Sequence, residues 1–275
     1  MLCASLMPDS SRPLPLLEEL GKDLLVVSRW RRIVSLVTPF VLAALFFIFA
    51  ARGWWFAALT CPVLLSFLTY GSISHDLVHR TLRLPRWLNE ALLCAIELLT
   101  FRSGHAYRLT HLHHHARFPA ADDLEAGASR MPLAQAMFDG LTLQPRLWLF
   151  AVKQKGPQQP WVIAEGIAIV LLLTATVLAL PHSFLPAIYA ALMIAGSWIF
   201  PIVTVLIPHD ATGETSLTQT RLFRGRMLSL LALEHLYHLE HHLYPQVPHH
   251  NWPKLARRLD PYFSRLGLEP IKLFF

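Results

Sequence analysis

Four apolar stretches, each about as long as a bilayer is thick, constrain the fold of this 275-residue chain more than any other feature. A helix needs about 20 mostly apolar residues to cross the hydrocarbon core of a membrane. Charged residues make up 15% of the chain, whereas soluble domains have roughly 25%. The stretches of sufficient length are residues 33–50, 54–73, 161–180 and 184–207. They predict an all-α integral membrane protein, with residues 1–275 forming a single domain.

The short gaps between these stretches predict two helical hairpins. Ala51-Arg52-Gly53 separates the first pair, and Pro181-His182-Ser183 separates the second. Two further stretches, residues 87–101 and 131–152, are shorter or interrupted by polar residues. We expect them to form helices at the membrane surface, because neither is apolar enough over a full span.

The basic residues favour one orientation of this topology. All but one of the 24 Lys and Arg residues lie outside the two hairpin turns, and the exception is Arg52. Because cytoplasmic loops collect Lys and Arg, both termini and the long central region are predicted to be cytoplasmic. The net charge of +6 then reflects topology, and no nucleic-acid partner is expected.

Histidine is enriched and clustered, with 15 residues in the chain. Three boxes stand out: His-x-x-x-His at residues 75–79, and His-x-x-His-His at residues 111–115 and 238–242. The predicted topology brings all three boxes to the cytoplasmic face. His182 is the one histidine on the opposite side.

The spacing within each box suits metal binding, because side chains at i, i+3 and i+4 share one face of a helix. Imidazole nitrogen binds iron, zinc, copper and nickel. Eight such ligands are too many for one ion and suit two, with positions left open for dioxygen. Two irons are expected, since redox-inert zinc would need only four ligands. The predicted ligands are His75, His79, His111, His114, His115, His238, His241 and His242.

The neighbours of the boxes supply further candidates. His209 follows the fourth apolar stretch and is a plausible ninth ligand, although a lone histidine there could be a surface residue. Asp76, Glu240 and Asp210 could accept the second ring N–H of a ligand histidine. Asp76 could instead cap a helix or pair with a nearby arginine. His235 lies three residues before His238 and could share its face, and His113 is expected to point away from the other histidines of its box. His105, His182, His249 and His250 are interpreted as ordinary polar residues.

These motifs resemble those of the membrane fatty acid desaturase superfamily, which includes acyl-lipid desaturases and carotenoid ring hydroxylases and ketolases. The resemblance runs from about Trp54 to Pro253 and includes the run from Tyr237 to Pro248 around the third box. It implies two irons at the cytoplasmic face, dioxygen as co-substrate and a lipid substrate. A further histidine near the end of the last span commonly joins the site in that family, which favours His209.

Two features narrow the resemblance. The first box has three intervening residues, where acyl-CoA Δ9 desaturases typically have four, and the third begins with His238, where front-end desaturases have glutamine. Both features fit methyl-end acyl-lipid desaturases and the carotenoid enzymes. The short chain and the segment Pro208-His209-Asp210 are similar to the carotenoid enzymes. Fatty acyl desaturation is the first expectation, and carotenoid ring oxidation is the second.

No fused electron carrier is visible, because the chain has neither a haem module nor a Gly-x-Gly-x-x-Gly motif opening a βαβ unit. A separate ferredoxin or cytochrome is the expected electron donor. A histidine-rich metal transporter or sensor is the alternative from another functional class. It predicts ionisable residues along a path through the spans, where Glu165 is the main candidate.

Overall fold

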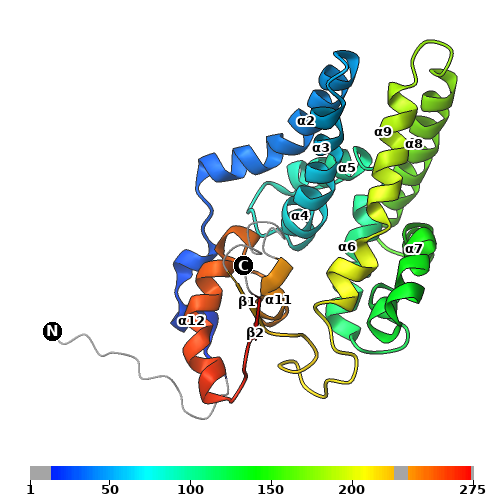
Figure 1. The fold of residues 1–275 in the computed structure, drawn as a ribbon. Helices are drawn as coiled ribbons and strands as arrows, with labels where there is room; N and C mark the ends of the chain where they lie inside the picture. Colours follow the sequence, from blue (N-terminus) through cyan, green and yellow to red (C-terminus); the bar gives the residue numbers. More distant parts are fainter. Residues whose placement is uncertain (1–13, 226–234, 274–275) are drawn as a thin grey trace.

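The protein is described by a computed structural model over residues 14–225 and 235–273, and nearly all of its regular elements are helices (Figure 1). The elements of the first half are α1 (Leu17–Leu20), η1 (Lys22–Leu25), α2 (Arg29–Ala51), α3 (Trp55–Leu68), η2 (Thr69–Ile73), α4 (Ser74–His79), α5 (Arg86–Leu98), α6 (Gly104–Arg117) and η3 (Glu125–Arg130). α5 covers residues 87–98 of the shorter apolar stretch 87–101, which is thus largely helical as predicted.

The second half repeats the pairing of long apolar helices and ends in short elements. These elements are α7 (Leu133–Lys153), α8 (Gln159–Leu178), α9 (Leu185–Ser197), η4 (Pro201–Leu206), β1 (Phe223–Arg224), η5 (His235–Tyr237), α11 (His238–Leu243), η6 (His249–Asn251), α12 (Trp252–Arg265) and β2 (Ile271–Lys272). The parallel pairing of β1 with β2 is a small departure from the all-α prediction. It brings the segment before the third box next to the C-terminal segment.

Four helical stretches are long and apolar enough to cross a membrane, which confirms the predicted number of spans. They are Lys22–Ala51, Trp55–His79, Gln159–Leu178 and Leu185–Leu206. The second stretch continues through η2 into α4, so the first histidine box extends the helix that carries the second span.

The outer surfaces of these helices expose large apolar side chains. Phe56 is 91% exposed, Leu178 is 71% exposed and Val170 is 63% exposed. Apolar exposure on this scale is unusual for a soluble protein and suits contact with lipid tails.

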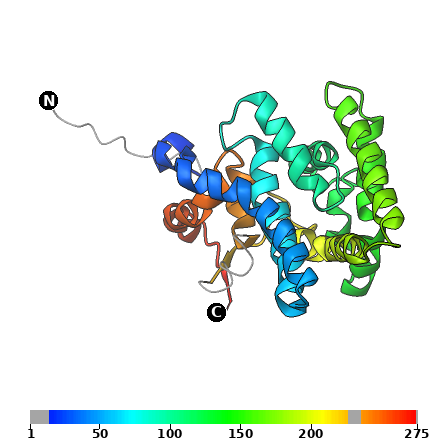
Figure 2. The ribbon, with the colours of Figure 1, turned by 90° about the horizontal axis from the view of Figure 1, so that it is seen from above.

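The long helices lie in neighbouring pairs. α2 packs against α3, α8 packs against α9, and α9 also contacts α3. In Figure 1 the turns after α2 and after α8 lie at the top, while α11 and α12 lie lower in the view. Figures 1 and 2 both place α12 on the opposite side of the molecule from α8.

Two of the long helices change from α to π geometry as they approach a histidine. η2 is a π-helix directly before α4 and His75, and η4 is a π-helix three residues before His209. Isolated π turns inside helices are rare and occur frequently at functional sites. Sequence reasoning gave no indication of either one.

The third box is positioned by a separate apolar core formed by α11, α12 and the N-terminal segment. Leu239 of α11 is fully buried and belongs to the same apolar cluster as Leu255 and Phe263 of α12. The Tyr244 hydroxyl donates to the Pro15 carbonyl at 2.7 Å. This packing fixes the short helix α11 although it has fewer than two full turns.

Candidate metal centre

The structure brings the nine histidines named from the sequence into two groups. In each group, one ring nitrogen per residue lies within 4.8 Å of those of all the others. The first histidine group is His75, His79, His111, His115 and His241, and the second histidine group is His114, His209, His238 and His242. Six of the nine are buried and three are half-buried.

The two groups interlock, because α6 and α11 each contribute to both. From α6, His111 and His115 enter the first group and His114 enters the second. The rings of His115 and His242 stack across the groups with centroids 4.4 Å apart. Two ions bound in these groups would therefore be close neighbours.

Four of the five histidines of the first group have their Nε2 atoms in a ring of short contacts. His75 Nε2 is 3.0 Å from His241 Nε2 and 3.1 Å from His111 Nε2. His115 Nε2 closes the ring at 3.1 Å from His111 Nε2 and 2.8 Å from His241 Nε2. Two nitrogens bonded at right angles to one metal at about 2.1 Å would lie ~3.0 Å apart.

The second group has the same geometry around His209. Its Nε2 is 2.9 Å from that of His114, 3.2 Å from that of His238 and 3.3 Å from that of His242. His238 and His242, one helical turn apart, have their Nε2 atoms 3.1 Å apart. His209 is thus a buried member of the second histidine group and not a surface residue.

Hydrogen bonds to the other ring nitrogens test whether a cation fits between these atoms. His209 Nδ1 lies 3.1 Å from the Val205 carbonyl, which can only accept, so the proton is on Nδ1. His114 Nδ1 donates to Asp123 Oδ2 at 2.7 Å. When both rings are in the neutral form that binds metal ions, their Nε2 atoms direct lone pairs at each other. That arrangement is repulsive without a cation between them and favourable with one.

The protonation state of the other rings agrees with this fit. Burial, and then the charge of neighbouring histidines, lowers the pKa of His111, His238, His241 and His242 well below the usual value. Neutral imidazole is the form that binds metal ions. His79 Nε2 is also buried and has no hydrogen-bond partner among the described residues.

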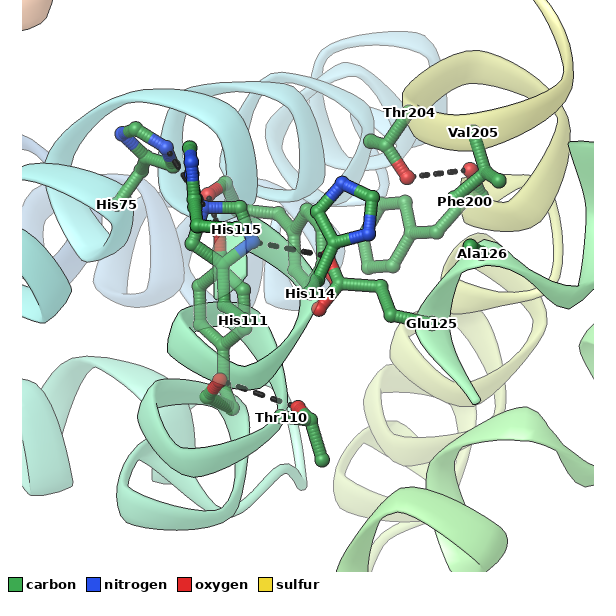
Figure 3. Close-up of polar contacts among 12 residues, drawn as sticks. His75, Thr110, His111, His114, His115, Glu125, Ala126, Phe200, Thr204 and Val205 are labelled. Atoms are coloured by element: carbon green, nitrogen blue, oxygen red, sulfur yellow. Dashed lines mark hydrogen bonds and ion pairs between the residues drawn. The ribbon is translucent and has the colours of Figure 1, made fainter. Parts of the chain in front are cut away.

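Two carboxylates that the sequence analysis did not single out hold ligand rings in place. Asp123 accepts from His114, and Glu125 Oε1 accepts from His111 Nδ1 at 3.0 Å. Figure 3 shows His111 between His75 and Glu125. Burial raises the pKa of Glu125 to about 7. A metal ion bound beside His111 would favour the ionised form of the Glu125 carboxyl. The acidic residues shortly after the second box were the feature of the sequence that could have indicated these two partners.

The three carboxylates named from the sequence have other partners. Asp76 accepts from the backbone N–H and Nδ1 of His249 at 3.0 and 2.8 Å. Glu240 Oε1 lies 2.6 Å from Arg224 Nη2. Asp210 accepts from the N–H and hydroxyl of Thr212 in a turn.

The expectation for these three carboxylates is therefore corrected. Among the described residues, none of them hydrogen-bonds a histidine of either group. Asp76 instead ties α4 to η6, which lies directly before α12, because His249 belongs to η6. His249 was interpreted as an ordinary polar residue and has this structural role.

A buried polar cluster lies on the same helix as the second box. His105 is fully buried, with Nδ1 2.7 Å from Glu165 Oε1 and Nε2 2.8 Å from Glu90 Oε2. Ser103 also donates to Glu165, at 2.6 Å. We call these four residues the His105 cluster; it connects α5, α6 and α8. The role of His105 was not predicted, because Glu90 and Glu165 are distant from it in the chain.

Arg108 joins this cluster to the first box. Its Nη2 donates to the Leu77 carbonyl at 2.9 Å, and its Nε donates to the Val78 carbonyl at 3.2 Å. The same guanidinium pairs with Glu90. The buried side chain therefore holds α4, with its two box histidines, against α6.

The two interlocked histidine groups, beside helices long and apolar enough to cross a membrane, define a candidate metal centre of a membrane protein. The family model for fatty acid desaturases matches residues 52–273. The chain therefore belongs to this family, within the membrane fatty acid desaturase superfamily. A comparison with curated proteins gave no match.

Proposed function

We propose that the two histidine groups bind two iron ions and that the protein uses dioxygen to oxidise a lipid hydrocarbon. Fatty acyl desaturation is the first candidate reaction, and carotenoid ring hydroxylation or ketolation is the second. The observation that carries the proposal is the pair of adjacent sets of histidine ring nitrogens, five and four in number, gathered inside the protein.

Iron is proposed because imidazole donors accept several metals but the family reaction requires a redox-active one. When bound, iron supplies the capacity to activate dioxygen and attack an unactivated C–H bond, which acid–base side chains lack. The nine nitrogen donors leave each ion with coordination positions for dioxygen and solvent.

The protein's own residues prepare these donors. Asp123 and Glu125 fix the tautomers and ring orientations of His114 and His111, so that Nε2 is presented to the metal. Val205 does the same for His209 through its carbonyl. Burial of six of the nine rings limits access of bulk water to the site.

The arrangement of helices supports a cytoplasmic position for the site. The two turns between the paired helices lie away from α11 and α12 in Figure 1, and one of the 24 Lys and Arg residues, Arg52, lies in a turn. The proposal places both termini and the metal centre in the cytoplasm. A separate ferredoxin- or cytochrome-type protein would supply electrons there.

The transporter alternative loses its main support in the structure. Glu165 is the ionisable residue that could have lined a path through the third span. It is 1% exposed and accepts from both His105 and Ser103. These bonds give Glu165 a structural role instead.

Metal analysis of protein purified without oxygen tests the proposal. We expect two irons per chain, and altered lipids in cells that produce the protein compared with cells that do not. Stoichiometric zinc without iron would overturn the metal assignment. Altered carotenoids with unchanged fatty acids would replace the first candidate reaction with the second.

A further inference from the structure

A largely apolar cavity of about 720 Å³ lies between α6, α7, α8 and α9. Its lining includes Tyr107, Leu141, Trp148, Ile169 and Ala195. Pockets that bind small molecules typically have volumes of about 300–1,000 Å³ and mostly apolar walls. The volume and lining both fit a lipid-sized ligand.

The walls of the cavity are held by close packing at two glycines. Gly166 of α8 lies against the Trp148 ring, and a Cβ there would lie 2.5 Å from Trp148 Cζ2. Gly140 of α7 lies against the backbone of Trp198, where a Cβ would collide with the carbonyl. The Trp148 indole N–H also donates to the Val162 carbonyl at 2.9 Å. The helices thus meet tightly around the open volume.

The cavity runs from the outer surface toward the first histidine group. Among its lining residues, Leu141, Val170 and Ile194 are 56%, 63% and 49% exposed, on helices that face lipid in the proposed topology. Tyr107 is buried and also lines the cavity, and its ring centroid lies 5.4 Å from that of His111. A molecule dissolved in the bilayer could therefore enter sideways and approach the metal centre.

One polar group in the wall lacks a partner. The hydroxyls of Thr100, Ser103, Tyr107 and Ser197 each donate to a protein oxygen. Gln144 also lines the cavity, and its Nε2 is buried without a hydrogen-bond partner among the described residues. A buried donor without an acceptor is unfavourable, so a ligand that supplies an acceptor there gains affinity.

We propose that this cavity binds the acyl chain of a lipid ester and that the Gln144 amide donates a hydrogen bond to the ester carbonyl oxygen. The proposal rests on the proposed function and deepens it by choosing between the two substrate classes. A hydrocarbon carotenoid has no oxygen and would leave the Gln144 amide unpaired. An acyl ester satisfies both the apolar wall and the single donor.

Photo-crosslinking in the absence of oxygen tests this without requiring turnover. The probe is a methyl palmitate analogue with a diazirine in mid-chain, added to the purified iron-loaded protein in detergent. We expect labelled peptides from α7 and α8, and competition by unlabelled methyl stearate. In Gln144→Met the ester should compete about 2- to 10-fold more weakly, while an alkane of equal length competes as in wild type.

Matched variants separate cavity binding from general lipid contact. Ala195→Phe places a ring in the cavity and should abolish the labelling. Ala175→Phe, at an exposed position of α8 outside the cavity lining, should leave it unchanged. Labelling that persists in Ala195→Phe, or an equal loss of ester and alkane affinity in Gln144→Met, would overturn the proposal. Competition by β-carotene that exceeds that of the ester would also overturn it.

The crosslinking result can be interpreted independently of the proposed oxidase activity. Protein that binds no iron but shows the expected labelling pattern would contradict the proposed function and keep the cavity assignment as a lipid-ester site. Protein that oxidises lipid while its labelling ignores Gln144 and Ala195 would keep the function and contradict the assignment.

Discussion

The histidine groups and the His105 cluster are both largely buried, and both include histidines of α6. They differ in what faces the ring nitrogens. In the His105 cluster each nitrogen of one ring meets a carboxylate, from Glu90 and from Glu165. In the second histidine group, the Nδ1 atoms of His114 and His209 donate to the Asp123 carboxylate and the Val205 carbonyl, and their Nε2 atoms face each other.

The difference shows how a structural histidine can be told from a metal ligand. A ring with both nitrogens paired to carboxylates has its polar groups satisfied and cross-links the helices that supply them. A ring whose Nε2 meets only other Nε2 atoms needs a cation to be satisfied. Sequence position does not separate the two cases, because His105 and His111 are six residues apart on one helix.

Loss of a ligand in the second group should have the largest effect on function. His209→Ala removes the nitrogen that contacts those of three neighbours, so we expect bound iron to fall from two ions to one and oxidase activity to fall to background. Iron content and product formation measure this. His182→Ala, at an exposed position in the turn after α8, is the matched control and should retain both irons. Two irons in His209→Ala would remove His209 from the ligand set.

The His105 cluster should instead respond in stability. His105→Leu leaves Glu90 and Glu165 without their shared partner, and breaking a buried pair in this way costs about 3–5 kcal/mol. Denaturant unfolding in detergent measures the change. The folded fraction should still bind two irons. Loss of iron from folded protein would mean that the cluster and the metal centre are not separable.

Removal of a carboxylate that hydrogen-bonds a predicted ligand should weaken metal binding but not abolish it. Asp123→Asn keeps the shape of the side chain but weakens the hold on His114 Nδ1, which should lower iron affinity by about 10- to 100-fold. Competition with a chelator gives the affinity. Asp122→Asn is the control, because the neighbouring Asp122 is exposed and pairs with Arg117. Equal affinities for the two variants would contradict the role of Asp123.

The smallest effect is expected at the histidine inside the second box that belongs to neither group. His113 faces Phe150 and lies 3.6 Å from the Asp122 carboxylate. His113→Ala should change the free energy of unfolding by less than about 0.5 kcal/mol and leave both irons bound. Its neighbour His114 offers the direct contrast, since His114→Ala should release an iron. A metal deficit in His113→Ala would show that the box spacing misassigns the ligands.

The four apolar helices and the clustering of the box histidines could be predicted from the sequence, because both depend on local pattern. Apolar length predicts a span, and i, i+3, i+4 spacing predicts which rings of a box share a face. His113, between two predicted ligands, lies outside both groups as expected. The division of the second and third boxes between the two groups was not predictable, because it depends on how α4, α6 and α11 pack.

The carboxylate partners could not be read from the sequence for the same reason. Asp76 and Glu240 are adjacent to ligands in the chain, but adjacent residues on a helix point in different directions. Asp76 therefore meets His249, while Asp123 returns to His114 from beyond the end of α6. Proximity along the chain misidentified the partners, whereas tertiary packing determines them.

The two π-helical segments help to set the directions in which the side chains of His75 and His209 point. Each residue of an α-helix turns the chain by about 100° around the axis, and a π turn accommodates an extra residue. If the same residues of η2 formed a regular α-helix, His75 and His79 would be rotated by about 100° relative to α3. Every box histidine would remain in the sequence, yet two would point away from their partners. A design that preserves the histidines but replaces the π turns of η2 and η4 with regular α-helix of the same length would therefore be unable to assemble this centre.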